Sequence, residues 1–195
     1  ENILEHNNIN IIYIFIGKKI SKINFNFKIN NYINYELPKK IIKLINNKVN
    51  KYKVILFGTQ LEDMNVKKNN NESEYYYAKS KRKLNIFLIK NQKFFNSKFI
   101  YLKLPSIYGK NISKMSLINK SIKAIRNKQN IKIKNINNKD YFLHIEDLCL
   151  LLKKIEGKNK LFRYKNLLDI KINGFGPIKI INIFKKLNYE KKIVI

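Results

Sequence analysis

The sequence contains one cysteine, Cys149, no tryptophan and no long apolar run. A single cysteine excludes a disulfide within the chain and a zinc site built from several thiolates, and we expect no metal site. We expect Cys149 itself to be a small buried residue. The longest apolar run near the start, "IIYIFI" at 11–16, is far shorter than the roughly 20 residues that span a bilayer. With no secretory signal pattern either, we predict a cytoplasmic protein without a membrane span.

Arginine is scarce although the chain is strongly basic. Lys and Arg number 41 against 13 Asp and Glu, which gives a formal net charge of +28, yet the arginines are only Arg82, Arg126 and Arg163. Proteins that bind nucleic acid specifically tend to use the planar guanidinium group of arginine in a localised patch, whereas the lysines of this chain are scattered among Asn and Ile. We therefore expect no specific nucleic-acid partner, only a diffuse field that attracts polyanions without specificity.

Short β-branched and aromatic runs alternate with helical patterns along the chain, which predicts an α/β fold with a parallel sheet. Strands are expected at 10–17, 52–58 and 98–105, with a short one near 130–134. Helices are expected at 37–50, around the segment "EYYYAKSKRKLNIF" (74–87), at 115–125 and at 145–155. We expect the segment 172–188 to be a glycine-rich turn that opens a helix.

Apolar spacing assigns faces to two of these helices. In 37–50, Pro38 lies near the expected first turn, and Ile41, Ile45 and Val49 recur at i, i+4. In 145–155, one face carries Leu148, Leu151, Leu152 and Ile155. Both rows predict buried faces.

Two overlapping Tyr-x-x-x-Lys pairs lie in the helix around 74–87. Tyr75 precedes Lys79 and Tyr77 precedes Lys81, so each pair is one helical turn apart. In a chain with 12 tyrosines and this much lysine, the motif alone is weak. We prefer Tyr77 and Lys81, because "YAKSK" places a small residue after the tyrosine and Ser80 before the lysine.

Further segments, in chain order, strengthen that choice. The segments "IFIGKK", "YINYELPKKIIKLI", "VILFGT", "YAKSK", "LKLPSIYG" and "DYFLHIEDL" resemble those of the extended short-chain dehydrogenase/reductases, the NAD-dependent epimerase/dehydratase family. The resemblance implies a Rossmann-like, doubly wound parallel sheet. It also implies a partial dinucleotide-binding domain at 1–110 and a small α/β substrate-binding part at 111–195, of which 131–155 return to the core.

The resemblance also assigns roles. It makes Tyr77 the general acid/base, Lys81 a ligand of the cofactor ribose, Thr59 a hydroxyl donor to the reacting oxygen, and Asn34 the residue that maintains a helix kink and a water beside Lys81. The implied contacts of NAD or NADP are Phe15, Gly17, Lys19, Asn34, Thr59, Tyr77, Lys81, Leu104 and Pro105. The implied contacts of substrate are Thr59, Gln60, Ser106 and Lys139.

The chemistry of the Tyr77–Lys81 pair follows from charge. A free phenol has a pKa near 10, so it seldom exchanges a proton at neutral pH. An ammonium one turn away and an oxidised nicotinamide would favour the phenolate and lower the pKa of Tyr77. Tyr77 would then give or take the proton of a sugar hydroxyl or ketone.

The sequence departs from the family in three places. It has no Gly-x-x-Gly-x-x-Gly fingerprint, so we expect a fragment that lacks the first strand and helix. Ile14 and Ile16 stand where the family more often has His and Ala. The family's arginine before "FLHIED" corresponds to Asp140 in a gapless comparison and to Lys139 with a one-residue bulge. We expect His144 in this segment to serve in packing.

The resemblance implies a nucleotide-diphosphate sugar as substrate. Dehydratases of the family carry Asp-Glu directly after the catalytic Thr, whereas Gln60 and Leu61 follow Thr59 here. The expected reaction is therefore that of a 4-epimerase or a 4-keto reductase with NAD or NADP. A non-catalytic dinucleotide-sensing or polyanion-binding protein on the same scaffold is the alternative, and a homodimer is left open.

Overall fold

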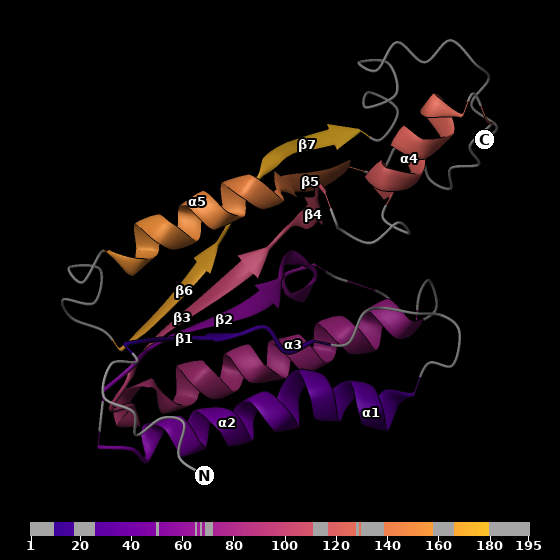
Figure 1. Cartoon of the computed structure of the whole chain (residues 1–195). Helices are drawn as coiled ribbons and strands as arrows, with labels where there is room; N and C mark the ends of the chain where they lie inside the picture. The colour runs from indigo at the N-terminus through magenta and orange to yellow at the C-terminus, as the bar shows by residue number, and fades with distance from the viewer. Residues whose placement is uncertain are drawn as a thin grey trace. The chain divides into compact units, whose positions relative to one another are not determined.

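The computed structural model describes residues 10–17, 26–49, 51–64, 66, 68, 72–110, 117–127, 129, 139–157 and 166–179 (Figure 1). The chain divides into two compact units, Glu1–Lys103 with Lys158–Lys171 and Leu104–Gly157 with Ile172–Ile195. The strand predicted near 130–134 and the predicted cofactor contact Lys19 lie outside the described residues. No helix in the described part of the chain is long and apolar enough to cross a membrane.

The first unit contains a four-stranded sheet. Its strand order is β1 (Ile11–Ile14), β2 (Lys53–Thr59), β3 (Lys98–Leu104), β6 (Leu167–Lys171). The pair β1–β2 is parallel, with Ile11 opposite Lys53, and β3–β6 is parallel, with Phe99 opposite Leu167. The three strands predicted from β-branched and aromatic runs are confirmed, and β6 was not predicted.

Helices lie along one side of this sheet (Figure 1). They are α1 (Phe27–Asn31), the π-helical turn η2 (Tyr32–Glu36), α2 (Leu37–Asn46) and α3 (Glu72–Asn91), with short 3₁₀ turns at η3 (Gln60–Glu62) and η4 (Gln92–Phe94). Asn26 caps the first of them, because its side-chain oxygen accepts a hydrogen bond from the Ile29 amide at 3.0 Å. The Rossmann-like parallel arrangement with flanking helices agrees with the predicted fold class.

The helix expected at 37–50 begins ten residues earlier and runs through Pro38. Proline lacks an N–H, and its ring collides with the carbonyl four residues back in a regular α-helix. Here the chain widens into the π-turn η2 just before Pro38, where the Leu37 amide bonds the Tyr32 carbonyl five residues back. The helix then ends at Asn46, which leaves Val49 97% exposed, so its predicted place on the buried face is wrong.

The core of the first unit joins α2 and α3 to one face of the sheet. Leu84 and Leu88 from α3 and Ile42 and Ile45 from α2 are all almost fully buried. They pack in one cluster with alternate residues of the strands, namely Ile14, Val54, Leu56, Phe99, Tyr101 and Leu167. This packing fixes the orientation of α3, since the buried Lys81 is one turn from Leu84 on the same face.

The second unit contains a three-stranded sheet of order β4 (Ser106–Tyr108), β5 (Lys139–His144), β7 (Phe175–Lys179), with helices α4 (Leu117–Arg126) and α5 (Ile145–Glu156). The pair β4–β5 is parallel and β5–β7 is antiparallel. The glycine-rich turn predicted within 172–188 is therefore wrong for Phe175–Lys179, which pair with β5, and the helix predicted to follow that turn lies outside the described residues from 180 on. Gly174 serves close approach instead, because a Cβ there would lie 2.3 Å from the Phe142 carbonyl oxygen.

Helix α5 confirms part of its predicted face. Leu148 and Ile155 are buried, whereas Cys149 is exposed, so its expected burial is wrong. One residue beyond Leu148 lies about 100° further around a helix, which turns Cys149 away from the buried face. His144 packs edge to face on Tyr108 as expected, and its Nδ1 also accepts the Glu146 amide as the helix cap.

We expect Leu88→Ala to destabilise the protein by about 2–5 kcal/mol, because it removes a side chain with no exposed surface from the cluster that joins α3 to the sheet. The neighbouring Ile89, which is 44% exposed, provides the matched control: Ile89→Ala is expected to cost less than about 1 kcal/mol. Chemical denaturation of both variants measures the difference. Equal losses would contradict the assigned face of α3.

Candidate active site

Lys81 is a deeply buried cation of the first unit. Its side chain is 3% exposed, and its ammonium donates to the carbonyl oxygens of Ile16 at 3.1 Å and Phe57 at 2.9 Å. Ile16 follows β1, and Phe57 lies near the end of β2. Lys81 therefore ties α3 to the carboxyl ends of two adjacent parallel strands, the edge where α/β sheets bind ligands.

Gly17 and Asn34 lie beside this ammonium. A Cβ added to Gly17 would be 3.6 Å from both the Lys81 Nζ and the Asn34 Oδ1. Asn34 has no exposed surface, lies in the π-turn η2 and donates from Nδ2 to the Asn30 carbonyl at 3.0 Å. The backbone at Gly17, after β1, thus lies next to Lys81 and Asn34, and a long side chain at position 17 would fill the space beside them.

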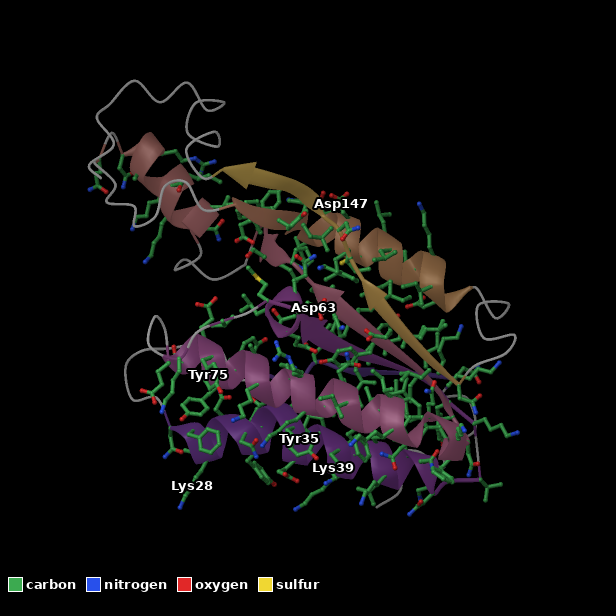
Figure 2. The ribbon with its side chains drawn as sticks, turned by 180° about the vertical axis from the view of Figure 1, so that it is seen from behind. Lys28, Tyr35, Lys39, Asp63, Tyr75 and Asp147 are labelled. Atoms are coloured by element: carbon green, nitrogen blue, oxygen red, sulfur yellow. The ribbon has the colours of Figure 1, made fainter. Side chains whose placement is uncertain are left out.

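The structure separates the two Tyr-x-x-x-Lys pairs. Tyr75 and Lys79 line an open pocket of about 440 Å³ together with Met64, Val66, Ala78, Arg82, Lys83 and Ile86. The Lys79 ammonium lies 5.6 Å from the centre of the Tyr75 ring, and Lys79 is exposed (Tyr75 is labelled in Figure 2). Lys81 is instead buried at the strand ends, and Tyr77 is half-buried one turn before it. The geometry thus supports the preference for Tyr77 and Lys81.

Thr59 begins a capping box at the end of β2. Its Oγ1 accepts the Leu61 amide at 3.3 Å, and its own amide donates to Glu62 Oε1 at 2.7 Å. Glu62 Oε1 also accepts the hydroxyl of Tyr101 at 2.8 Å. The same hydroxyl lies 3.2 Å from the Lys81 carbonyl oxygen, so this network connects the Thr59 backbone to that of Lys81.

Burial shifts the pKa values of Glu62, Lys81 and Tyr77. Desolvation raises the pKa of Glu62 to about 7 and lowers the pKa of Lys81 to about 8. The pKa of Tyr77 is raised to about 12, first by burial and then by the charge of Glu62. The prediction that Lys81 lowers the pKa of Tyr77 is therefore wrong, because burial and the charge of Glu62 raise this pKa instead. The effect of a bound nicotinamide on the same pKa stays a prediction.

Glu62 and Tyr101 were not among the residues predicted from the sequence. Glu62 is 2% exposed and Tyr101 has no exposed surface. The spacing Thr-x-x-Glu directly after a strand is a capping-box signature, and it would have identified Glu62. Tyr101 lies inside a strand of apolar residues, where nothing in the sequence distinguishes it from a core aromatic residue.

The remaining predicted residues of the first unit lie near the same strand ends. Phe15 follows β1, is 67% exposed and stacks on Phe57 with 4.4 Å between ring centres. Gln60 is buried directly after Thr59, and Asp63 follows at the end of this turn, where Lys103 bonds it at 3.0 Å (Figure 2). The structure places these residues at the end of β1 and β2 without showing what they bind.

The second unit contains the other predicted contacts. Leu104 and Pro105 are buried, and the Ser106 hydroxyl donates to Asp140 Oδ2 at 2.8 Å. Burial raises the pKa of Asp140. The backbone of Lys139 pairs with β7, and the register between these strands shifts between Asp140 and Phe142. Ser106 and Asp140 thus form one polar pair, and the binding role of Lys139 stays a prediction.

Lys81 makes the stability of the protein depend on pH. Its pKa is depressed to about 8 from 10.5, so between these values the unfolded chain binds more protons, and stability rises with pH. We expect the parent to gain about 1–2 kcal/mol relative to Lys81→Met between pH 8 and pH 9.5. Denaturation at several pH values measures this gain.

Lys79→Met is the control for that titration, since Lys79 is exposed on the same helix. The difference between parent and Lys79→Met is expected to stay constant over the same pH range. A constant difference for Lys81→Met as well would show that the ammonium is not desolvated.

The comparisons with known proteins agree with the fold. A model of the "NAD dependent epimerase/dehydratase family" matches residues 1–160. No curated protein matches the chain.

Solved structures match in fold at low sequence identity. A UDP-glucuronic acid 4-epimerase from Bacillus cereus, in complex with UDP-glucuronic acid and NAD, gives a TM-score of 0.73 at 14% identity, covering 95% of this chain and 61% of that chain. RMD from Pseudomonas aeruginosa, complexed with NADPH, gives 0.73 at 10% identity over 91% and 64%. A UDP-N-acetylglucosamine 4-epimerase from Methanobrevibacter ruminantium M1, in complex with UDP-N-acetylmuramic acid, gives 0.70 at 15% over 90% and 58%. The chain thus spans about 60% of the length of these proteins.

Proposed function

Because the chain belongs to the NAD dependent epimerase/dehydratase family, we propose that it serves in an NAD(P)-dependent enzyme that acts on a nucleotide-diphosphate sugar, as a 4-keto reductase or a 4-epimerase. The observation that carries the proposal is the buried Lys81 ammonium, held by two carbonyls at the carboxyl ends of parallel strands, one turn after Tyr77. Similar folds in complex with NAD, NADPH and UDP-sugars support the choice of cofactor and substrate class.

The residues around Lys81 fit the nicotinamide half of such a cofactor. The backbone at Gly17 lies against Lys81 and Asn34, where a large side chain would occupy the space that a ribose needs. We assign ribose binding to Lys81 and the approach of the cofactor to Gly17 and Phe15. A bound nicotinamide would supply the hydride acceptor or donor.

The chain's own part in the reaction is proton transfer and orientation. Tyr77 exchanges a proton between its phenol oxygen and the oxygen at the reacting carbon of the sugar, while the Thr59 hydroxyl binds the same oxygen. The Tyr77 phenol is protonated at neutral pH and burial raises its pKa further, which suits proton donation to a keto oxygen. This supports the 4-keto reductase, and the epimerases among the solved structures support the second candidate.

Dehydration is not part of the proposal. Gln60 and Leu61 follow Thr59, and neither can serve as an acid or a base for the expulsion of water. The Glu62 carboxyl faces the Thr59 amide and the Tyr101 hydroxyl, and both of these groups donate a hydrogen bond to its Oε1.

We expect Tyr77→Phe in the full-length gene product to reduce turnover of the nucleotide sugar by about 10²–10⁴, because it removes the proton-transferring oxygen. Cofactor affinity is expected to stay nearly unchanged. Steady-state kinetics and calorimetry measure the two quantities.

Tyr75→Phe is the matched control, because Tyr75 lines the pocket on α3 and precedes the exposed Lys79. Its turnover is expected to stay within about threefold of the parent. If Tyr77→Phe were equally mild, Tyr77 would not be the acid/base. Absence of turnover in the parent would instead favour a non-catalytic dinucleotide-sensing protein.

We also expect the 195-residue chain to bind NAD no more tightly than nicotinamide mononucleotide. The proposed contacts at Lys81, Tyr77 and Gly17 all address the nicotinamide half, and the 195 residues contain no Gly-x-x-Gly-x-x-Gly to hold a pyrophosphate. Calorimetry with both ligands makes the comparison. Micromolar binding of NAD with weak binding of the mononucleotide would show that these residues hold the adenosine half.

A further inference from the structure

Glu62 is a buried carboxyl that the proposed reaction does not use. Its side chain is 2% exposed and lies in the 3₁₀ turn that follows β2. Oε1 accepts both the Thr59 amide at 2.7 Å and the Tyr101 hydroxyl at 2.8 Å. Oε2 is buried without a hydrogen-bond partner among the described residues. Such a group costs free energy to bury, so its position calls for a physical explanation.

Gly58 makes room for this arrangement. A Cβ at position 58 would lie 2.5 Å from the Tyr101 ring and 2.6 Å from Glu62 Oε1. Any other residue there would displace the carboxyl or the ring. The end of β2 is thus shaped so that Glu62 and Tyr101 meet directly behind Thr59.

The contact between Glu62 and Tyr101 also extends to α3. The Tyr101 hydroxyl lies 3.2 Å from the Lys81 carbonyl oxygen, and the Arg82 guanidinium donates to the Glu62 carbonyl oxygen through Nε at 2.6 Å. Glu62 therefore contacts, directly or through Tyr101, the backbone of both Thr59 and Lys81.

We propose that Glu62 is a positioning residue of the Tyr77–Lys81 site: its carboxyl fixes Thr59 relative to α3, and its charge acts on the Lys81 ammonium and the Tyr77 phenol. This rests on the proposed function in that the Tyr77–Lys81 pair is taken as the reacting site. The electrostatic part can be measured without any turnover.

Several charged and titratable groups face Glu62. Tyr77, Lys81 and Arg82 come from α3, Tyr101 and Lys103 come from β3, and Asp63 follows Glu62 in the chain. An ionised Glu62 stabilises the Lys81 ammonium and opposes a Tyr77 phenolate. Protonation of Glu62 removes both effects, and because its pKa is near 7 this happens close to neutral pH.

The test variant removes the charge of Glu62 and keeps the shape of its side chain. In Glu62→Gln the amide oxygen still accepts the Thr59 amide and the Tyr101 hydroxyl, but no negative charge forms. The titration of Lys81 is followed by NMR of ¹³Cε-labelled lysine, with its resonance identified by its loss in Lys81→Met. We expect the Lys81 midpoint in Glu62→Gln to lie at least about 0.5 pH unit below the parent's.

Asp63→Asn is the matched control, because it removes the same charge from the next residue, whose side chain pairs with Lys103 and Lys171. Its Lys81 midpoint is expected to move by less than about half as much. An unchanged midpoint in Glu62→Gln, or an equal shift in both variants, would overturn the proposal.

A second variant separates position from charge. Gly58→Ala keeps the Glu62 charge and displaces the carboxyl or the Tyr101 ring that holds it, so the Lys81 midpoint is expected to move in this variant too.

In the full-length product, the pH profile of turnover in Glu62→Gln is expected to lose an inflection near pH 7 that the parent shows. An unaltered profile in an active enzyme would overturn the proposal, whereas absence of turnover in the parent contradicts only the proposed function and leaves the NMR result decisive.

Discussion

The first unit depends on the buried ammonium of Lys81. Lys81 Nζ bonds the carbonyl oxygens of Ile16 and Phe57, at the ends of adjacent parallel strands, and so fastens α3 to the edge of the sheet. A buried charge persists only with good hydrogen-bond partners, and these carbonyls provide them. The packing of Leu84 and Leu88 fixes the same helix face, so core and site share one constraint. The same burial that fixes Lys81 also lowers its pKa to about 8.

A second hydrogen-bond network connects the end of β2 to helix α3. Thr59, Glu62 and Tyr101 connect β2, the turn η3 and β3, and Tyr101 reaches the Lys81 carbonyl. Because Glu62 is both a structural link and a charge, the geometry and the electrostatics of the site are coupled. Gly58 is the steric condition for this link.

Much of this arrangement could be predicted from local patterns. Apolar runs predicted β1, β2 and β3, and helical spacing placed Tyr77 and Lys81 on one face. The apolar spacing did not predict the π-turn before Pro38, because proline at that point is equally typical of a helix start, although the resemblance implied a helix kink at Asn34. The strand β7 was missed because its pairing with β5 is a long-range contact, whereas the glycines around it suggest a turn. Glu62 was missed because a glutamate in a basic chain gives no sign of burial, apart from its capping-box spacing.

The most direct test of the account is a crystal structure of the full-length gene product with NAD(P) and a nucleotide sugar bound. The account predicts that Lys81 Nζ lies within hydrogen-bond distance of the nicotinamide ribose while it keeps its bonds to Ile16 and Phe57. It also predicts the Tyr77 hydroxyl and the Thr59 hydroxyl on the oxygen of the reacting sugar carbon. A nicotinamide bound away from Lys81, or a sugar out of reach of Tyr77, would contradict it.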